Sequence, residues 1–346
     1  VACPSEVRIG DIIQQARLKY SKHAPSLRDR MLASTDFVGT MATPFAPIVN
    51  GMLHLKPVKK IMDKVLGIDS RRTFPSYSRE LFTEWYKREA ENEQLKYDKH
   101  VAYFHGCYVQ YNYPQLGKDM IKVLNALGYG VILLEEEKCC GVAKIANGLV
   151  KEATRDADIN LRAIRKAVKH GVSAILSTSS TCTFTIRDEY THVLGIDARD
   201  VRDDVMLATR FVYSLIDEAG AKLAFRRDYH KRVAYHVPCH MERLGWSVYS
   251  MSLMRMIPGL DYVPLDPNCC GIAGTYGFKK ENYDYSQAMG RPLFDEIERA
   301  GVDLVATDCE TCKWQIEMST GLPVQNPISI LADALDVEET KKLNNL

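Results

Sequence analysis

The sequence of 346 residues lacks a strong net charge, a glycine-rich dinucleotide fingerprint and an unbroken membrane-spanning run. Its 45 Lys and Arg residues balance 44 Asp and Glu residues, and a net charge of +1 gives no electrostatic basis for nucleic-acid binding. Without a G-x-G-x-x-G motif, hydride transfer from NAD or FAD is not expected on this chain. Residues 37–55 contain no Asp, Glu, Lys or Arg, but Gly39, Pro44, Pro47 and Gly51 interrupt them, which argues against a transmembrane helix.

Cysteine is the informative residue type, because nine of the ten cysteines fall into a frame that occurs twice. The first copy contains Cys107, Cys139, Cys140 and Cys182, and the second contains Cys239, Cys269, Cys270, Cys309 and Cys312. Corresponding cysteines are 132, 130 and 130 residues apart, and a glycine follows each Cys-Cys pair. Ser179 stands where the second copy has Cys309. A repeat of this kind indicates two copies of one structural unit.

Short apolar runs alternate with helix-like segments from about residue 100 onward, which predicts an α/β fold with two parallel-sheet βαβ units. The predicted strands are 101–105, 130–134 and 173–177 in the first unit, and 232–236, 261–265 and 302–306 in the second. We expect three regions: a helical segment over 1–99, a first unit over 100–225 and a second over 226–346.

Each cysteine group follows directly after a predicted strand. The carboxyl ends of parallel strands lie at one edge of a sheet, so the thiols of each unit should converge there. Adjacent cysteines are poorly suited to a disulfide with each other, and five thiols exceed the four ligands of tetrahedral zinc. An iron–sulfur cluster therefore fits the second unit best, and the glycines after the Cys-Cys pairs could let backbone amides reach its sulfurs. Zinc, buried free thiols and disulfides are the competing interpretations, and the four thiols of the first unit suit either zinc or a cluster.

The duplicated Cys-Cys-Gly frame resembles the cysteine-rich CCG domain found in the B subunit of heterodisulfide reductase and its relatives, over residues 101 to about 335. The resemblance implies a noncubane [4Fe–4S] cluster in the second unit. The ligands carried over by position are Cys239, Cys269, Cys270, Cys309 and Cys312. In the first unit the corresponding residues are Cys107, Cys139, Cys140 and Cys182, where Ser179 replaces a ligand and the metal is left open between zinc and another cluster.

Further segments are similar to the C subunits of anaerobic glycerol-3-phosphate dehydrogenases. They are CPSEVRIGDIIQ (3–14), TPFAPIVN (43–50), FHGC (104–107), YPQLGKDMIKVLNALG (113–128), TSSTCTF (178–184), CCGIAGTYGFKKENY (269–283) and DCETCKWQIEMSTGL (308–322). This resemblance implies a subunit without substrate chemistry of its own, which carries electrons in anaerobic respiration from a flavin-containing catalytic dimer to menaquinone. It also implies peripheral attachment to the cytoplasmic face of the inner membrane. The alternative is an enzyme that reduces a disulfide at its cluster, as in the heterodisulfide reductase branch.

The first residues match the end of a ferredoxin motif, because Cys3 is followed by Pro4 as in C-x2-C-x2-C-x3-C-P. The C subunits of anaerobic glycerol-3-phosphate dehydrogenases, which this chain resembles, begin with two such motifs. We therefore expect 1–99 to include the remnant of a ferredoxin-like domain, in which Cys3 would be a metal ligand with no partner in this chain.

Two other regions allow both a functional and a structural interpretation. Residues 37–55 followed by Lys56, Lys59, Lys60 and Lys64 suit a membrane-interface segment, or equally a helix packed on the sheet units. The side chains close to the cysteine motifs are His105, His236, His240, Lys279, Lys280, Lys313 and Trp314. We interpret the three histidines as packing residues rather than proton donors; the lysines could offset cluster charge or be solvated, and the tryptophan could shield a cluster.

Overall fold

The computed structural model describes residues 7, 9–20 and 24–346, and its framework is two sheets of four parallel strands each. The first sheet has the order β2-β1-β3-β4 and the second β6-β5-β7-β8. The first is built from β1 (Lys99–Tyr103), β2 (Tyr129–Leu133), β3 (Ile175–Ser177) and β4 (Val205–Leu207), and the second from β5 (Lys231–Tyr235), β6 (Leu260–Pro264), β7 (Leu304–Ala306) and β8 (Val324–Gln325). The predicted duplicated α/β fold is confirmed.

Helices connect and cover the strands of both units. The first unit contains α8 (Gly106–Tyr111), α9 (Pro114–Ala126), α10 (Val142–Ala146), α11 (Val150–Lys169), α12 (Ser180–Phe184), the π-helix η3 (Thr185–Glu189), α13 (Tyr190–His192) and α14 (Ala208–Asp217). The second contains α15 (Cys239–Leu244), α16 (Ser247–Arg255), η4 (Tyr276–Phe278), η5 (Lys280–Asn282), α17 (Tyr283–Ala300), α18 (Glu310–Thr320), α19 (Pro327–Ala334) and α20 (Val337–Leu343).

The alternation of side chains along the central strands explains how the two sheets share one core. On β1, Val101 and Tyr103 face the core common to both units, whereas Ala102 faces a separate core of the first unit. On β5, Val233 and Tyr235 face the common core in the same way. Because neighbouring residues of a strand point to opposite faces, each sheet is apolar on both sides.

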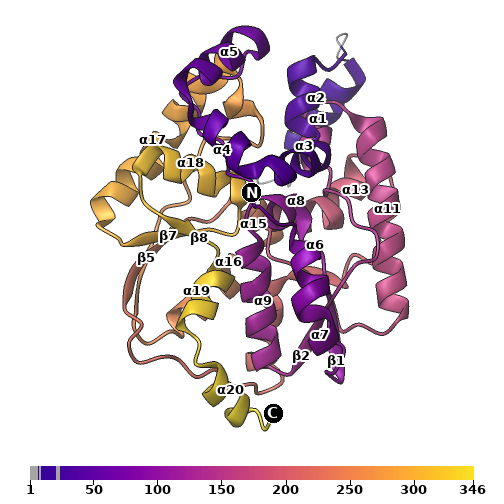
Figure 1. Ribbon diagram of the computed structural model, residues 1–346, viewed down its shortest axis with the longest axis vertical. Helices are drawn as coiled ribbons and strands as arrows, with labels where there is room; N and C mark the ends of the chain where they lie inside the picture. Colours follow the sequence, from indigo (N-terminus) through magenta and orange to yellow (C-terminus); the bar gives the residue numbers. More distant parts are fainter. Residues whose placement is uncertain (1–6, 8, 21–23) are drawn as a thin grey trace.

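Five layers result from this arrangement. Helices α9, α14, α16 and α19 fill the space between the sheets, as their shared core residues and mutual packing show. Helix α11 contributes to the outer core of the first sheet and α17 to that of the second. Figure 1 shows α11 and α17 on opposite sides of the molecule, with α9, α16 and α19 between them.

The six strands predicted from the sequence are present, and their ends agree with the predicted ones to within two residues. The two edge strands β4 and β8 were not predicted, because runs of three and two residues give too little periodicity for recognition. Both pair in parallel with the neighbouring strand and extend the sheets beyond the repeated core.

The segment before β1 is helical, as predicted, and its first part covers the ends of the sheets from which the cysteine loops emerge. It comprises α1 (Ile9–Tyr20), α2 (Leu27–Ala33), α3 (Thr35–Ala42), η1 (Thr43–Phe45), α4 (Ala46–His54), α5 (Lys56–Leu66), α6 (Phe82–Trp85), the π-helix η2 (Tyr86–Ala90) and α7 (Glu91–Gln94). Helices α1–α5 gather at one end of the molecule, and the C-terminus lies at the other (Figure 1). Helix α5 buries no residue, and its Ile61 and Val65 are 62% and 72% exposed. Its apolar spacing therefore does not produce a buried face.

Arg72 attaches the segment before β1 to the second unit. Its guanidinium is only 1% exposed and donates to the Gly277 carbonyl at 2.5 Å, to the Ser286 hydroxyl at 2.9 Å and to the Gln315 side-chain carbonyl. The side chain of the neighbouring Arg71 is 53% exposed, and it forms ion pairs with the buried Asp69 and the exposed Asp284.

Substitution of these two arginines should separate the buried contact from the surface contact. Arg72→Met should lower the free energy of unfolding by about 3 kcal/mol, because it leaves buried polar groups unpaired. Arg71→Met should lower it by less than Arg72→Met does, because the Arg71 side chain is half exposed and only its partner Asp69 is buried. Urea denaturation of both variants measures the difference, and equal losses would contradict the role assigned to Arg72.

Candidate iron–sulfur centres

The four thiols of the first unit converge where β1, β2 and β3 end. Cys107 lies on α8, Cys139 and Cys140 precede α10, and Cys182 lies on α12. The Sγ atoms of Cys107 and Cys139 are 3.7 Å apart. A β-carbon at Gly106, which has φ +69°, would lie 3.2 Å from Cys182 Sγ, so this glycine lets the backbone approach the sulfur.

The five thiols of the second unit are arranged in the same way around the ends of β5, β6 and β7. Cys239 begins α15, Cys269 and Cys270 follow β6, Cys309 caps α18, and Cys312 lies in the first turn of α18. The Sγ atoms of Cys270 and Cys312 are 3.1 Å apart. The Gly271 amide donates to Cys269 Sγ at 3.3 Å, as expected for a glycine beside a cluster.

The electrostatics of both sites favour deprotonated sulfur at selected positions. A hydrogen bond from the Cys312 thiol is the main cause that lowers the pKa of Cys309 to about 6. Hydrogen bonds from neighbouring thiols likewise hold the pKa values of Cys139 and Cys270 well below the ordinary value. Thiolates are the ligand form of cysteine, so the sites are suited to soft metal ions.

His236 is a candidate ligand, although its sequence position had suggested a packing residue. Its ring is 1% exposed, and neither ring nitrogen hydrogen-bonds to protein within the described residues. The potential donor atoms of His236, Cys270 and Cys312 lie within 4.8 Å of one another. The sequence signal was its position three residues before Cys239, but only the fold brings the ring to Cys270. Because zinc also binds mixed sets of nitrogen and sulfur ligands, this site suits zinc as well as an iron–sulfur cluster.

Ser179 and Glu310 connect the two sites. The Ser179 hydroxyl donates to the Glu310 carboxylate at 2.8 Å and also caps α12 by accepting from the Cys182 amide. Thr181 Oγ1 lies 3.6 Å from Cys309 Sγ, so residues of the first site contact the second. Burial, with a smaller contribution from the nearby Cys309 thiolate, raises the pKa of Glu310 to about 8. The serine that replaces a thiol thus forms a contact between the units.

Two acidic residues outside the cysteine motifs complete the first site. The Asp36 carboxylate on α3 accepts a hydrogen bond from the Cys139 amide at 2.8 Å, and burial raises its pKa to about 6. Glu137 accepts from the amides of His105 and Gly106 at 3.1 and 2.6 Å. No sequence pattern pointed to Asp36, which lies 103 positions before Cys139.

The remaining side chains named from the sequence have structural partners. His105 packs against Phe82 and contacts Glu137 at 3.3 Å, and His240 stacks on Phe184. Lys279, Lys280 and Lys313 pair with Asp29, Asp63 and Glu317, respectively. Trp314 packs edge-on against Tyr108 at 5.8 Å between centroids. Cys3 lies outside the described residues.

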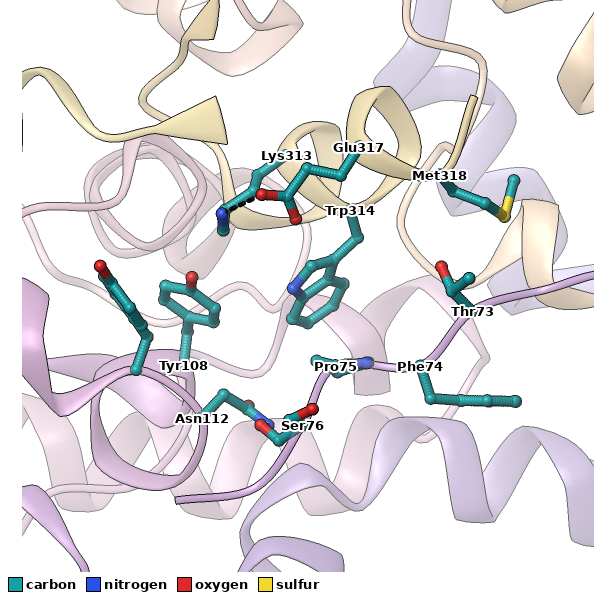
Figure 2. Close-up of a pocket in the computed structure, with 11 residues that line it drawn as sticks. Thr73, Phe74, Pro75, Ser76, Tyr108, Asn112, Lys313, Trp314, Glu317 and Met318 are labelled. Carbon is teal, nitrogen blue, oxygen red and sulfur yellow. Dashed lines mark hydrogen bonds and ion pairs between the residues drawn. The ribbon is translucent and has the colours of Figure 1, made fainter. Parts of the chain in front are cut away.

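Two cavities adjoin the sites. The inner cavity, with a volume of about 370 Å³, reaches from the helices before β1 to the thiols of the first unit. The outer pocket, of about 350 Å³, lies on the other side of Pro75 and Trp314 and contains the Lys313–Glu317 ion pair (Figure 2).

The donor set fits iron–sulfur clusters. The nine cysteines of the described residues are free thiols and form one group in each unit. Apart from the His236 ring, the candidate donor atoms are sulfur. Sulfur-rich sites with adjacent amide donors are typical of such clusters.

Comparison with known proteins identifies relatives over nearly the whole chain. The family model described as a cysteine-rich CCG domain matches residues 101–187 and 233–317. The C subunit of the anaerobic glycerol-3-phosphate dehydrogenase of Escherichia coli strain K12 is 56% identical, over 96% of this chain and 83% of that protein. The D subunit of the dihydromethanophenazine:CoB–CoM heterodisulfide reductase of Methanosarcina barkeri is 27% identical, over 68% of this chain and 59% of that protein. Lactate utilization protein A of Geobacillus kaustophilus is 31% identical, over 60% of this chain and 87% of that protein.

Substitutions in the second unit should distinguish an essential ligand from an additional one. Cys312→Ala should remove about half of the iron, because it deletes a buried thiol at the centre of one of two sites. Cys309→Ser reproduces the serine of the first unit and should retain iron with an altered visible spectrum, because serine still offers a hydroxyl oxygen at this position whereas alanine offers no donor atom.

Iron and sulfide analysis of anaerobically purified protein measures both effects. Unchanged iron in Cys312→Ala would remove this residue from the ligand set, and zinc in place of iron would favour the competing interpretation.

Proposed function

Because the chain belongs to the cysteine-rich CCG family, and within it to the C subunits of anaerobic glycerol-3-phosphate dehydrogenases, we propose that it is an iron–sulfur electron-transfer subunit. It passes electrons from a flavin-dependent dehydrogenase partner to menaquinone. Oxidation of the alcohol carbon of glycerol 3-phosphate releases two electrons and two protons at the flavin. Reduction of the quinone to a quinol consumes the same number.

The observation that carries this proposal is the close approach of the two thiol groups in a chain that is 56% identical to such a subunit. A cluster bound at either group would supply one-electron redox chemistry. The chain itself holds the thiols in loops and helices that follow the strands of two sheets, and the Thr181–Cys309 contact joins the two groups. The chain positions the redox groups and leaves substrate oxidation to its partner.

The electron-transfer role predicts a selective loss of activity. In the complex with the dehydrogenase partner, Cys312→Ala should abolish glycerol-3-phosphate-dependent reduction of a menaquinone analogue, because the electron path is broken. Dye reduction by the flavoprotein should remain, because its chemistry does not use this chain. The chain alone should not oxidise glycerol 3-phosphate. Turnover by the isolated chain, or full quinone reduction by the variant, would refute the assignment.

We propose that the chain attaches to the cytoplasmic face of the membrane through α3, η1 and α4. An exposed apolar stripe runs along these helices, formed by Phe37, Met41, Phe45, Ile48, Met52 and Leu55. Lysines 56, 59, 60 and 64 follow on α5 and would contact anionic headgroups. Among the described residues, no helix combines the length and apolarity needed to cross a bilayer. A stripe of this kind suits a helix lying in the membrane interface.

Membrane attachment can be tested with matched pairs of exposed apolar residues. Phe45→Ser with Ile48→Ser should lower binding to phosphatidylglycerol-containing vesicles by about tenfold or more, because two large side chains no longer enter the interface. Tyr285→Ser with Met289→Ser on α17 is the control, since these residues are 73% and 62% exposed, against 59% and 64% for the first pair. Vesicle co-sedimentation measures binding, and equal effects of both pairs would exclude the stripe as the attachment site.

A second candidate function is reduction of a disulfide at the thiol site, supported by the similarity to a heterodisulfide reductase subunit. Its place would be the five-thiol site of the second unit, where Cys239 and Cys269 are exposed, because the inner cavity beside the first-unit thiols is lined by no Lys or Arg among the described residues that could bind an anionic disulfide. Disulfide-dependent oxidation of the reduced protein, without quinone, would favour this second function.

A further inference from the structure

The inner cavity lies directly between the proposed membrane-binding helices and the thiols of the first unit. Its outer wall includes Val38 and Ala42 of α3 and Val49 and Leu53 of α4. Its opposite end is formed by the first-unit thiols. Its volume is about 370 Å³, and because all four first-unit thiols line it, this volume includes the space in which a metal or cluster bound to them would sit.

Helices α3 and α4 separate this cavity from the exposed apolar stripe by a single layer. Val38 and Val49 line the cavity, whereas the adjacent Phe37 and Ile48 are 70% and 64% exposed on the outside. These helices are therefore apolar on the outer side at Phe37 and Ile48, and on the half-buried cavity side at Val38 and Val49. An apolar compound could pass from a membrane surface to the cavity along them, because Asp36, the one acidic side chain of α3 and α4, contacts the Cys139 amide and does not line the cavity.

The chemistry of the lining changes from one end of the cavity to the other. Apolar side chains form most of the wall near α3 and α4, and no Lys or Arg lies in the described lining. Near the sulfurs, the hydroxyl groups of Thr35, Tyr77 and Thr181 line the same space. Hydroxyls can donate hydrogen bonds to carbonyl oxygens. The lining thus suits a ligand with an apolar body and a carbonyl-bearing ring at its sulfur end.

We propose that the inner cavity binds the ring of a membrane quinone against the thiol site of the first unit, with the isoprenoid tail leaving between α3 and α4. This inference rests on the proposed function and adds the location of the quinone site. An acyl chain would make no use of the hydroxyl groups at the sulfur end, and an anionic ligand would find no cation in the lining.

Trp314 supplies a reporter for this site, because it lines both the inner cavity and the outer pocket, and Figure 2 shows its indole in the outer pocket. The other two tryptophans are Trp85, which stacks on Phe82, and Trp246, which packs in a separate cluster with Leu207 and Met241. A quinone ring in the inner cavity should therefore quench the fluorescence of Trp314 in particular.

The first experiment fills the cavity. The fluorescent quinol analogue 2-heptyl-4-hydroxyquinoline N-oxide is titrated with the full chain, in complex with its dehydrogenase partner. Val49→Trp should raise the dissociation constant by about tenfold or more, because the indole fills the part of the cavity beside α4 through which the tail of the analogue would leave. Val65→Trp makes the same substitution on α5, where the side chain is 72% exposed, and should leave the dissociation constant unchanged. Unchanged affinity in a folded Val49→Trp protein would overturn the proposal.

The second experiment does not depend on the folding of a cavity-filling variant. Menadione, which has the naphthoquinone ring without a tail, should quench the fluorescence of the full chain. Trp314→Phe should remove most of this quenching, whereas Trp246→Phe should retain it. Quenching that persists in Trp314→Phe would overturn the proposal, as would complete displacement of the analogue by oleate with no binding of menadione, which would identify an acyl-chain site.

The outcomes also separate the cavity from the proposed function. If the complex reduces quinone and Val49→Trp changes neither binding nor turnover, the cavity assignment fails and the electron-transfer function stands. If the analogue binds as predicted but Cys312→Ala leaves quinone reduction intact, the electron path fails and the binding site stands.

Discussion

Asp308, at the end of β7, forms the buried junction on which the arrangement of both thiol sites depends. Its carboxylate accepts hydrogen bonds from the Tyr235 hydroxyl at 2.6 Å and from Ser250 at 3.1 Å. Its backbone carbonyl accepts from both the amide and the hydroxyl of Ser180 in the other unit. The residue after Asp308 is Cys309, and the residue before Ser180 is Ser179. One buried residue therefore fixes the distance between corresponding positions of the two repeats.

In the first unit, Thr178 stands at the position that corresponds to Asp308 and forms a similar junction. The Tyr103 hydroxyl bonds to Thr178, as Tyr235 does to Asp308, and Asn326 of the second unit donates to the Thr178 carbonyl. The repeat thus extends beyond the cysteines to the hydrogen bonds that terminate the central strands. Burial raises the pKa of Asp308 to about 6, because a charged carboxylate is costly away from water, whereas the neutral Thr178 hydroxyl carries no such cost.

Because Ser179 stands where the second unit has Cys309, the first site has one thiol fewer and an additional hydrogen bond between the units. A thiol at position 179 would accept hydrogen bonds weakly and could not replace the hydroxyl that links Glu310 to α12. The first unit has lost a potential ligand and gained a contact between the units. Its remaining four thiols border the inner cavity, whereas Cys239 and Cys269 of the second unit are exposed.

Local sequence was enough to establish the duplication, the six core strands and the assignment of nine thiols to two groups. These follow from periodicity along the chain and from the rule that loops at the carboxyl ends of parallel strands meet. The side chains that join the groups from elsewhere became visible only in the folded chain. Asp36 reaches Cys139 from a helix that lies 103 residues earlier, and the His236 ring turns toward Cys270. The adjacency of the two sites and the cavity under α3 and α4 depend on the packing of whole units, which no local pattern of residues encodes.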